Sequence, residues 1–241
     1  MDSSNAQMFP AEIIDSLPVL SSLEIGIYFL PIVLLIFWLI DEKKGLCLGI
    51  LAMLSIWCGL YFGSYFTIGI WTGLAVGIIL LVIWFVLDSR LTKLFAAAGT
   101  RSQNICAAAI ALAMNGLLPG DRMLPALFLS FCIGYTIMKS RFPFFARKEI
   151  NGKMPGLVVM AVRCLTGSLG LGIIIIVSRF VLPGEGSLFV DFHYWSTRSP
   201  FYEVGQFIRY GLIGLWVSAG APRVFQQMGL AQNPKGEGSE A

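Results

Sequence analysis

Long blocks of apolar residues, separated by short polar stretches, dominate the pattern of this sequence. A helix that spans the apolar core of a bilayer needs about 20 residues. The pattern therefore predicts seven membrane-spanning helices. They cover residues 23–40, 45–65, 67–87, 103–119, 123–139, 157–180 and 205–221. The predicted fold is an all-α, polytopic bundle of transmembrane helices.

The second and third predicted helices form a tight hairpin. No charged residue occurs between Gly45 and Leu87, and this stretch is too long for a single crossing. On this basis the chain divides into an outer N-terminal segment (1–22), one transmembrane domain (23–221) and a cytoplasmic tail (222–241).

Composition supports a membrane protein and excludes several other classes. Hydrophobic residues make up 56% of the chain and charged residues only 13%, about half the charged share of a soluble domain. The net charge of +3 is too small to indicate a nucleic-acid partner. The 5 cysteines lie in apolar runs without a CxxC pair, which favours packing roles over a disulfide framework or a zinc site.

The N-terminal apolar run is expected to be retained as a first span. The first twenty residues contain Asp2, Glu12 and Asp15 but no lysine or arginine, which is not the n-region of a cleaved signal peptide.

The basic residues indicate an orientation, because twelve of the 17 fall in every second loop or in the tail. These twelve are Lys43, Lys44, Arg90, Lys93, Arg101, Lys139, Arg141, Arg147, Lys148, Lys153, Arg223 and Lys235. Loops rich in lysine and arginine stay in the cytoplasm. We therefore expect the N-terminus outside and the C-terminus in the cytoplasm.

Two loops are candidate contact surfaces. The cytoplasmic loop 139–154 combines basic residues, Arg147 and Lys148 among them, with three phenylalanines: Phe142, Phe144 and Phe145. This mixture is typical either of contact with anionic headgroups or of a topological anchor.

The outer loop 184–204 is dense in aromatic residues, including Phe192, His193, Tyr194 and Trp195. It is expected to lie at the membrane surface or to dock another subunit. His193 is the one histidine of the chain, and a single histidine cannot build a metal site, so none is predicted.

Ionisable residues within spans are few. Arg163 lies near the cytoplasmic end of the sixth helix and is expected to extend to the interface, or to pair with a lipid phosphate or a partner's carboxylate. Arg209 is expected to pair with Glu203. No acidic residue falls at mid-membrane, which disfavours an ion-coupled transporter. Small residues at 167–172 predict close helix packing.

Three stretches of the chain resemble the bacterial branch of the type 2 phosphatidic acid phosphatase superfamily. Residues 28–51 read YFLPIVLLIFWLIDEKKGLCLGIL and are similar to its first span, charged turn and second span. Residues 73–95, GLAVGIILLVIWFVLDSRLTKLF, are similar to the helix after its last catalytic motif. Residues 209–230, RYGLIGLWVSAGAPRVFQQMGL, are similar to its C-terminal span.

The resemblance implies a site that this chain has lost. Active members carry a Lys followed by Arg-Pro, then Pro-Ser-Gly-His, then an Arg followed by a catalytic His and an Asp. Here no Lys, Arg or His occurs between Lys44 and Arg90, and Pro-Ser-Gly-His is absent. On this alignment Tyr65 replaces the nucleophilic histidine and Gly69 the orienting aspartate. A two-helix catalytic hairpin is deleted, which should leave an apolar cleft beside the first pair of helices.

The predicted function is that of a non-catalytic relative of these phosphatases in a bacterial inner membrane. It would act as a structural subunit of a membrane complex, binding membrane lipids or another hydrophobic ligand and other membrane subunits, without a resident cofactor. The alternative is an active lipid-phosphate phosphatase with a rearranged outer site of His193, Arg198 and Arg209. A lone histidine without an acid partner argues against it.

Overall fold

All the regular elements are helices in the part of the chain that the computed structural model describes. That part comprises residues 32–65, 75–80, 82–83, 86, 99–118, 122–146, 155–182 and 200–231. Its elements are η1 (Ile36–Ile40), α2 (Glu42–Tyr65), α4 (Thr100–Leu117), α5 (Met123–Arg141), α6 (Leu157–Val181), α7 (Pro200–Leu215), η3 (Trp216–Gly220) and α8 (Ala221–Gln227). The predicted all-α membrane bundle is confirmed.

The sequence pattern located these helices closely. The bounds of α2, α4, α5 and α6 lie within three residues of the predicted ones. Residues 42–62 of α2, the whole of α5 and the whole of α6 are long and apolar enough to cross a membrane. Most of the predicted third span and the start of the first lie outside the described residues, so the total of seven spans stays a prediction.

The seventh predicted helix extends beyond its expected end. Helix α7 continues through the wide π turn η3 into α8, because the residues at both joins keep α-helical backbone angles. The helical stretch therefore ends at Gln227, within what the sequence suggested was the tail.

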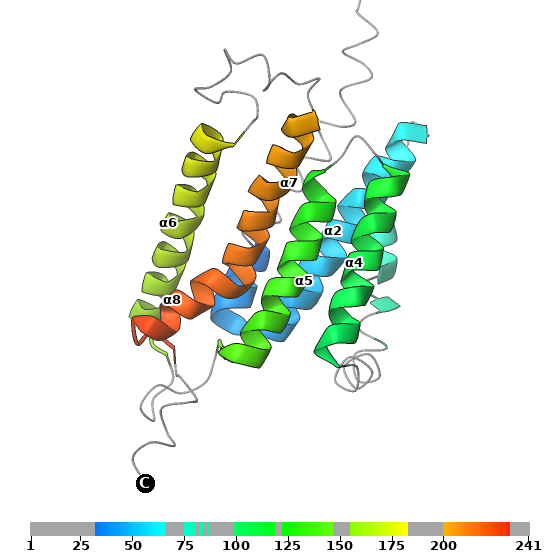
Figure 1. Cartoon of the computed structure of the whole chain (residues 1–241). Helices are drawn as coiled ribbons and strands as arrows, with labels where there is room; N and C mark the ends of the chain where they lie inside the picture. Colours follow the sequence, from blue (N-terminus) through cyan, green and yellow to red (C-terminus); the bar gives the residue numbers. More distant parts are fainter. Residues whose placement is uncertain are drawn as a thin grey trace, which may run out of the picture.

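From α4 to α7, each helix runs opposite to the one before it, and α2 runs in the same direction as α4 (Figure 1). Helices α2, α4 and α6 begin at the end where α8 lies, and α5 and α7 run towards that end. The α8 end therefore collects many of the basic residues: Lys43, Lys44, Arg101, Lys139, Arg141 and Arg223. This gathering agrees with the charge alternation of the sequence, and the positive-inside rule predicts that the α8 end faces the cytoplasm.

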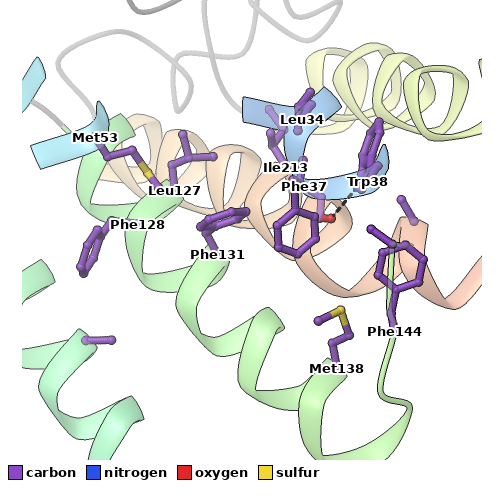
Figure 2. Packing of buried hydrophobic residues seen from close by; sticks show 14 of the residues in the cluster. Leu34, Phe37, Trp38, Met53, Leu127, Phe128, Phe131, Met138, Phe144 and Ile213 are labelled. Atoms are coloured by element: carbon purple, nitrogen blue, oxygen red, sulfur yellow. Dashed lines mark hydrogen bonds between the residues drawn. The ribbon is translucent and has the colours of Figure 1, made fainter. Parts of the chain in front are cut away.

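Helix α5 forms the centre of the bundle, and α6 stands at its edge. In the most apolar 18-residue stretch of each helix, 56% of the stretch is buried in α5 but only 11% in α6. Figure 2 shows Phe128 and Phe131 of α5 with Met53, Phe37 and other core side chains. The ring centroids of Phe37 and Phe131 lie 5.6 Å apart. Because so little of α6 is buried, most of its apolar surface suits contact with lipid or another helix.

The first helices pack directly onto this centre. The Phe131 ring lies against Gly49 of α2, where a side chain would leave no room for it. The Trp57 indole N–H of α2 donates to the Met114 carbonyl of α4 at 3.2 Å. The apolar cleft expected beside the first pair of helices is therefore closed at these two levels.

Two tryptophans in the wide turns hold η1 to η3 and η3 to α6. Trp38 of η1 donates its indole N–H to the Val217 carbonyl at 3.0 Å, drawn as a dashed line in Figure 2. Trp216 of η3 donates to the Gly167 carbonyl of α6, also at 3.0 Å. Wide π turns interrupt the regular backbone ladder and occur often at functional positions.

Glycines of α6 make this contact possible. A Cβ on Gly167 would overlap the Trp38 ring, and one on Gly170 would overlap the Trp216 ring. The predicted close packing at 167–172 is thus confirmed, since glycine lets the indole rings lie against the helix backbone.

Gly167→Ala is expected to destabilise the protein by about 1–3 kcal/mol, because Trp38 is buried and cannot move aside. Gly172→Ala in the same helix is the matched control, since a Cβ there meets open space. Its melting temperature in detergent should equal or slightly exceed that of the wild type, because alanine favours helix. Equal loss in both variants would contradict the packing described above.

Candidate functional site

A fully buried arginine ties four segments of the chain together at the α8 end of the bundle. Arg163, in the second turn of α6, is 0% exposed. Around it lie the end of η1, the loop after α5 and the chain that follows α8. We call this cluster the Arg163 junction; it comprises Arg163, Trp38, Glu42, Phe144, Ala146 and Leu230.

The guanidinium of Arg163 donates to backbone carbonyls of three of these segments. Nε and Nη2 both donate to the Leu230 carbonyl, at 3.0 and 2.6 Å. Nη1 donates to the Ala146 carbonyl at 2.7 Å and more weakly to the Trp38 carbonyl at 3.4 Å. Burying a charge is costly unless its donors are satisfied, and these carbonyls provide that satisfaction.

A carboxylate is linked to the junction through the backbone of one residue, Ala146. The backbone N–H of Ala146 donates to Glu42 Oε2 at 3.1 Å, while the carbonyl of the same residue accepts from Arg163. Glu42 begins α2 and is almost fully buried. Both polar groups of Ala146 are therefore bonded, and Glu42 and Arg163 hold the loop from opposite sides.

Aromatic rings enclose the junction. The guanidinium carbon of Arg163 lies 5.5 Å from the centre of the Phe144 ring, a cation–π distance. The Phe225 ring of α8 lies 5.8 Å from Trp38, edge-on, and 6.0 Å from Phe144. The rings exclude water, and in the resulting low dielectric each polar contact of the arginine is strengthened.

The same loop is held by α8 from the other side. Gln226 donates its amide N–H to the Pro143 carbonyl at 2.9 Å. The Arg223 guanidinium lies 5.3 Å from the centre of the Phe142 ring. Residues 142–146 are thus fixed by side chains of α2, α6 and α8.

The position of Arg163 corrects the sequence-based expectation. The arginine does not extend to the interface, because protein encloses it on all sides and its bonds go to backbone carbonyls within the chain. Phe144 is also buried and so does not contact lipid. Phe145 is 41% exposed and Phe142 half-buried, so these two remain accessible at the surface.

Several of the predicted positions lie outside the described residues: Arg147, Lys148, Phe192, His193, Tyr194, Trp195, Arg198 and Gly69. Tyr65 is the last residue of α2.

The expected pair of Arg209 with Glu203 is wrong. Glu203 accepts from Arg122 instead, with a distance of 3.0 Å between Nη2 and Oε2. Arg122 also bonds to Asn115, and this cluster joins the ends of α4, α5 and α7 opposite the Arg163 junction. Arg209 contacts α6 through the Ser178 carbonyl, at 3.5 Å.

The sequence reading missed Glu42, Trp38 and Leu230 as members of the junction. Residues 41–44 were read as one charged loop, yet Asp41 Oδ1 accepts from the backbone N–H of Lys43 at 2.8 Å. That contact is an N-terminal cap, so an Asp followed by Glu at the head of an apolar run could have marked a helix start with Glu42 inside it.

Comparison with known families gives one match, over the second half of the bundle. Residues 123–233 match the family model described as PAP2 superfamily phosphatase, transmembrane extension. The resemblance to this superfamily is confirmed. No curated protein and no solved structure gives a match.

The PAP2-like region supplies most of the Arg163 junction. It contains α5 through α8 and, with them, Arg163, Phe144, Ala146 and Leu230. Trp38 and Glu42 come from the preceding part of the chain. The junction therefore attaches the first helices to the PAP2-like region. Among the described residues, no group of His, Cys, Asp or Glu could hold a metal ion.

Arg163→Met is expected to lower stability by roughly 3–5 kcal/mol, because it leaves buried carbonyls of three segments without a donor. The melting temperature in detergent should fall, and limited proteolysis should cut the chain after α8 faster. Arg223→Met is the control, since its exposed cation–π contact contributes about 0.5–1 kcal/mol. Similar behaviour of the two variants would show that the junction does not hold the C-terminal segment.

Substitutions of Glu42 should separate charge from hydrogen bonding. Glu42→Ala leaves the buried Ala146 N–H without an acceptor and is expected to cost about 1–3 kcal/mol. Glu42→Gln retains an acceptor oxygen and should lose less than half as much. If thermal melting ranks the two variants in the reverse order, the bond to Ala146 is not what makes Glu42 important.

Proposed function

We propose that this protein is a non-catalytic PAP2-like membrane protein that serves as a structural or lipid-binding subunit of a membrane complex. The observation that carries the proposal is the arrangement around Arg163. Arg163 of the PAP2-like region is 0% exposed, and its guanidinium donates hydrogen bonds to the backbone carbonyls of three segments. These bonds favour a structural role for Arg163, because a phosphoryl group could contact the guanidinium only by displacing those segments.

The sequence supports the same conclusion. Phosphoryl transfer needs fixed positive charge around the transition state and a nucleophile in reach. The stretch between Lys44 and Arg90 contains no Lys, Arg or His, and α2 ends there at Tyr65. The residues that the resemblance assigns to catalysis are therefore replaced by groups unable to supply this chemistry at neutral pH.

The exposed face of α6 supports a role as a subunit or lipid-binding scaffold. Its exposed large side chains are Leu157, Val158, Leu165, Leu169, Ile173, Ile175, Ile176, Val177, Phe180 and Val181. A face of this length that is mostly apolar suits acyl chains or a partner's transmembrane helix. A bacterial inner membrane, as the resemblance implies, is the proposed location.

Purification in mild detergent followed by a phosphate-release assay tests this function. We expect no hydrolysis of lysophosphatidic acid or undecaprenyl diphosphate above that of membranes lacking the protein. Lipid or another membrane protein should remain bound after size-exclusion chromatography, and mass spectrometry should identify it.

Two outcomes would overturn the proposal. Phosphate release that disappears in His193→Ala would establish the alternative, a phosphatase with a rearranged site. Recovery of an inactive chain free of both lipid and protein would remove the subunit role.

A further inference from the structure

A second arginine lies half-buried where α6 and α7 meet, at the end of the bundle opposite the Arg163 junction. Arg209 belongs to α7, and its Nη2 lies 3.5 Å from the Ser178 carbonyl of α6. Ser178 lies three residues before the end of α6 at Val181. The guanidinium is therefore about one helical turn inside that end of the bundle.

Arg209 is poorly satisfied by the protein around it. Its contact with Ser178 is long for a hydrogen bond, and the same carbonyl already accepts from the Leu182 N–H at 2.9 Å. Its Nε is buried and has no hydrogen-bond partner among the described residues. Arginine has five N–H donors, so most of the donor capacity of Arg209 is unused there. Arg163, by contrast, makes bonds as short as 2.6 Å.

The surroundings of Arg209 offer a second cation and an apolar surface. Glu203, the acidic residue of the first turn of α7, is engaged by Arg122. Arg179 follows Ser178 directly and is exposed. Val177, Phe180 and Ile208 expose apolar side chains nearby on the same two helices. A ligand that suits this place has a negative head and an apolar body.

We infer that Arg209, assisted by Arg179, binds the phosphate of an anionic phospholipid in the leaflet at this end of the bundle. A guanidinium donates two parallel hydrogen bonds to a phosphate, which would satisfy the unused donors of Arg209. One helical turn inside the bundle is the depth of the boundary between headgroups and acyl chains. The acyl chains lie along the exposed side chains of α6 and α7. The inference rests on the proposed lipid-binding function and names its lipid class and its place.

The test is native mass spectrometry of the full chain taken from nanodiscs of phosphatidylglycerol and phosphatidylcholine. The wild type should retain phosphatidylglycerol in preference to phosphatidylcholine. Arg209→Gln should weaken retention of phosphatidylglycerol about tenfold, which corresponds to the loss of one charge-assisted contact. Retention of phosphatidylglycerol by Arg209→Lys should lie between that of the wild type and that of Arg209→Gln, because an ammonium group keeps the charge but cannot donate in a bidentate manner.

Arg101→Gln is the matched control, since it removes one exposed charge at the α8 end and should leave retention unchanged. Arg179→Gln, at an exposed position, provides a second variant if Arg209→Gln does not fold, and it should reduce retention severalfold. If the wild type, Arg209→Gln and Arg179→Gln all retain phosphatidylglycerol equally, the inference is overturned. Thermal protection by inorganic phosphate alone, as strong as that by phosphatidylglycerol, would identify a soluble phosphate compound and overturn the lipid assignment.

These results separate the inference from the proposed function. If the lipid data fail while the chain stays inactive and keeps a protein partner, the headgroup site is wrong and the structural role stands. If phosphate release is found, the non-catalytic role is wrong, whatever the lipid data show.

Discussion

The burial of one charged guanidinium in a largely apolar bundle is the constraint on which this structure depends. No carboxylate of the described residues contacts Arg163, and its charge is balanced there by the dipoles of backbone carbonyls and by the face of Phe144. Those carbonyls belong to η1, to the loop after α5 and to the segment after α8. The arginine can remain buried only while all three are in place. A single side chain therefore makes the first and last parts of the chain depend on one another.

The tryptophan contacts extend this dependence along α6. Trp38 and Trp216 lie in the two wide turns, and both pack on glycines of α6. Each indole N–H also finds a backbone carbonyl, as a buried tryptophan requires. Among the described residues, α6 is attached by these contacts, by α7 and by the Arg163 junction. Many large apolar side chains on the rest of its surface are exposed and suit contact with the surrounding membrane.

The sequence predicted the helices well and the polar contacts poorly, for a physical reason. Helix positions follow from hydrophobic length, which is a local property, and α5 and α6 begin at the predicted residues 123 and 157. The partners of Arg163 and Glu203 depend on which helices become neighbours. Chain positions do not reveal that Leu230 lies beside Arg163, 67 residues earlier. For Glu203, the nearby Arg209 was the natural candidate, yet Arg122 reaches it from the start of α5. The small residues at 167–172 were interpreted correctly, because close packing is what glycine permits wherever the partner comes from.

The two hydrogen bonds from Arg163 to Leu230 bear on the order in which this protein assembles. Leu230 follows all the helices described above in the sequence, so it is synthesised after them. Until then, the guanidinium in the second turn of α6 lacks its nearest acceptor and has to be hydrated or bound to headgroups. During synthesis α6 must therefore keep its first turns close to the membrane surface. The junction is complete only when the segment after α8 has been made and folds against α6, where its carbonyl replaces that water.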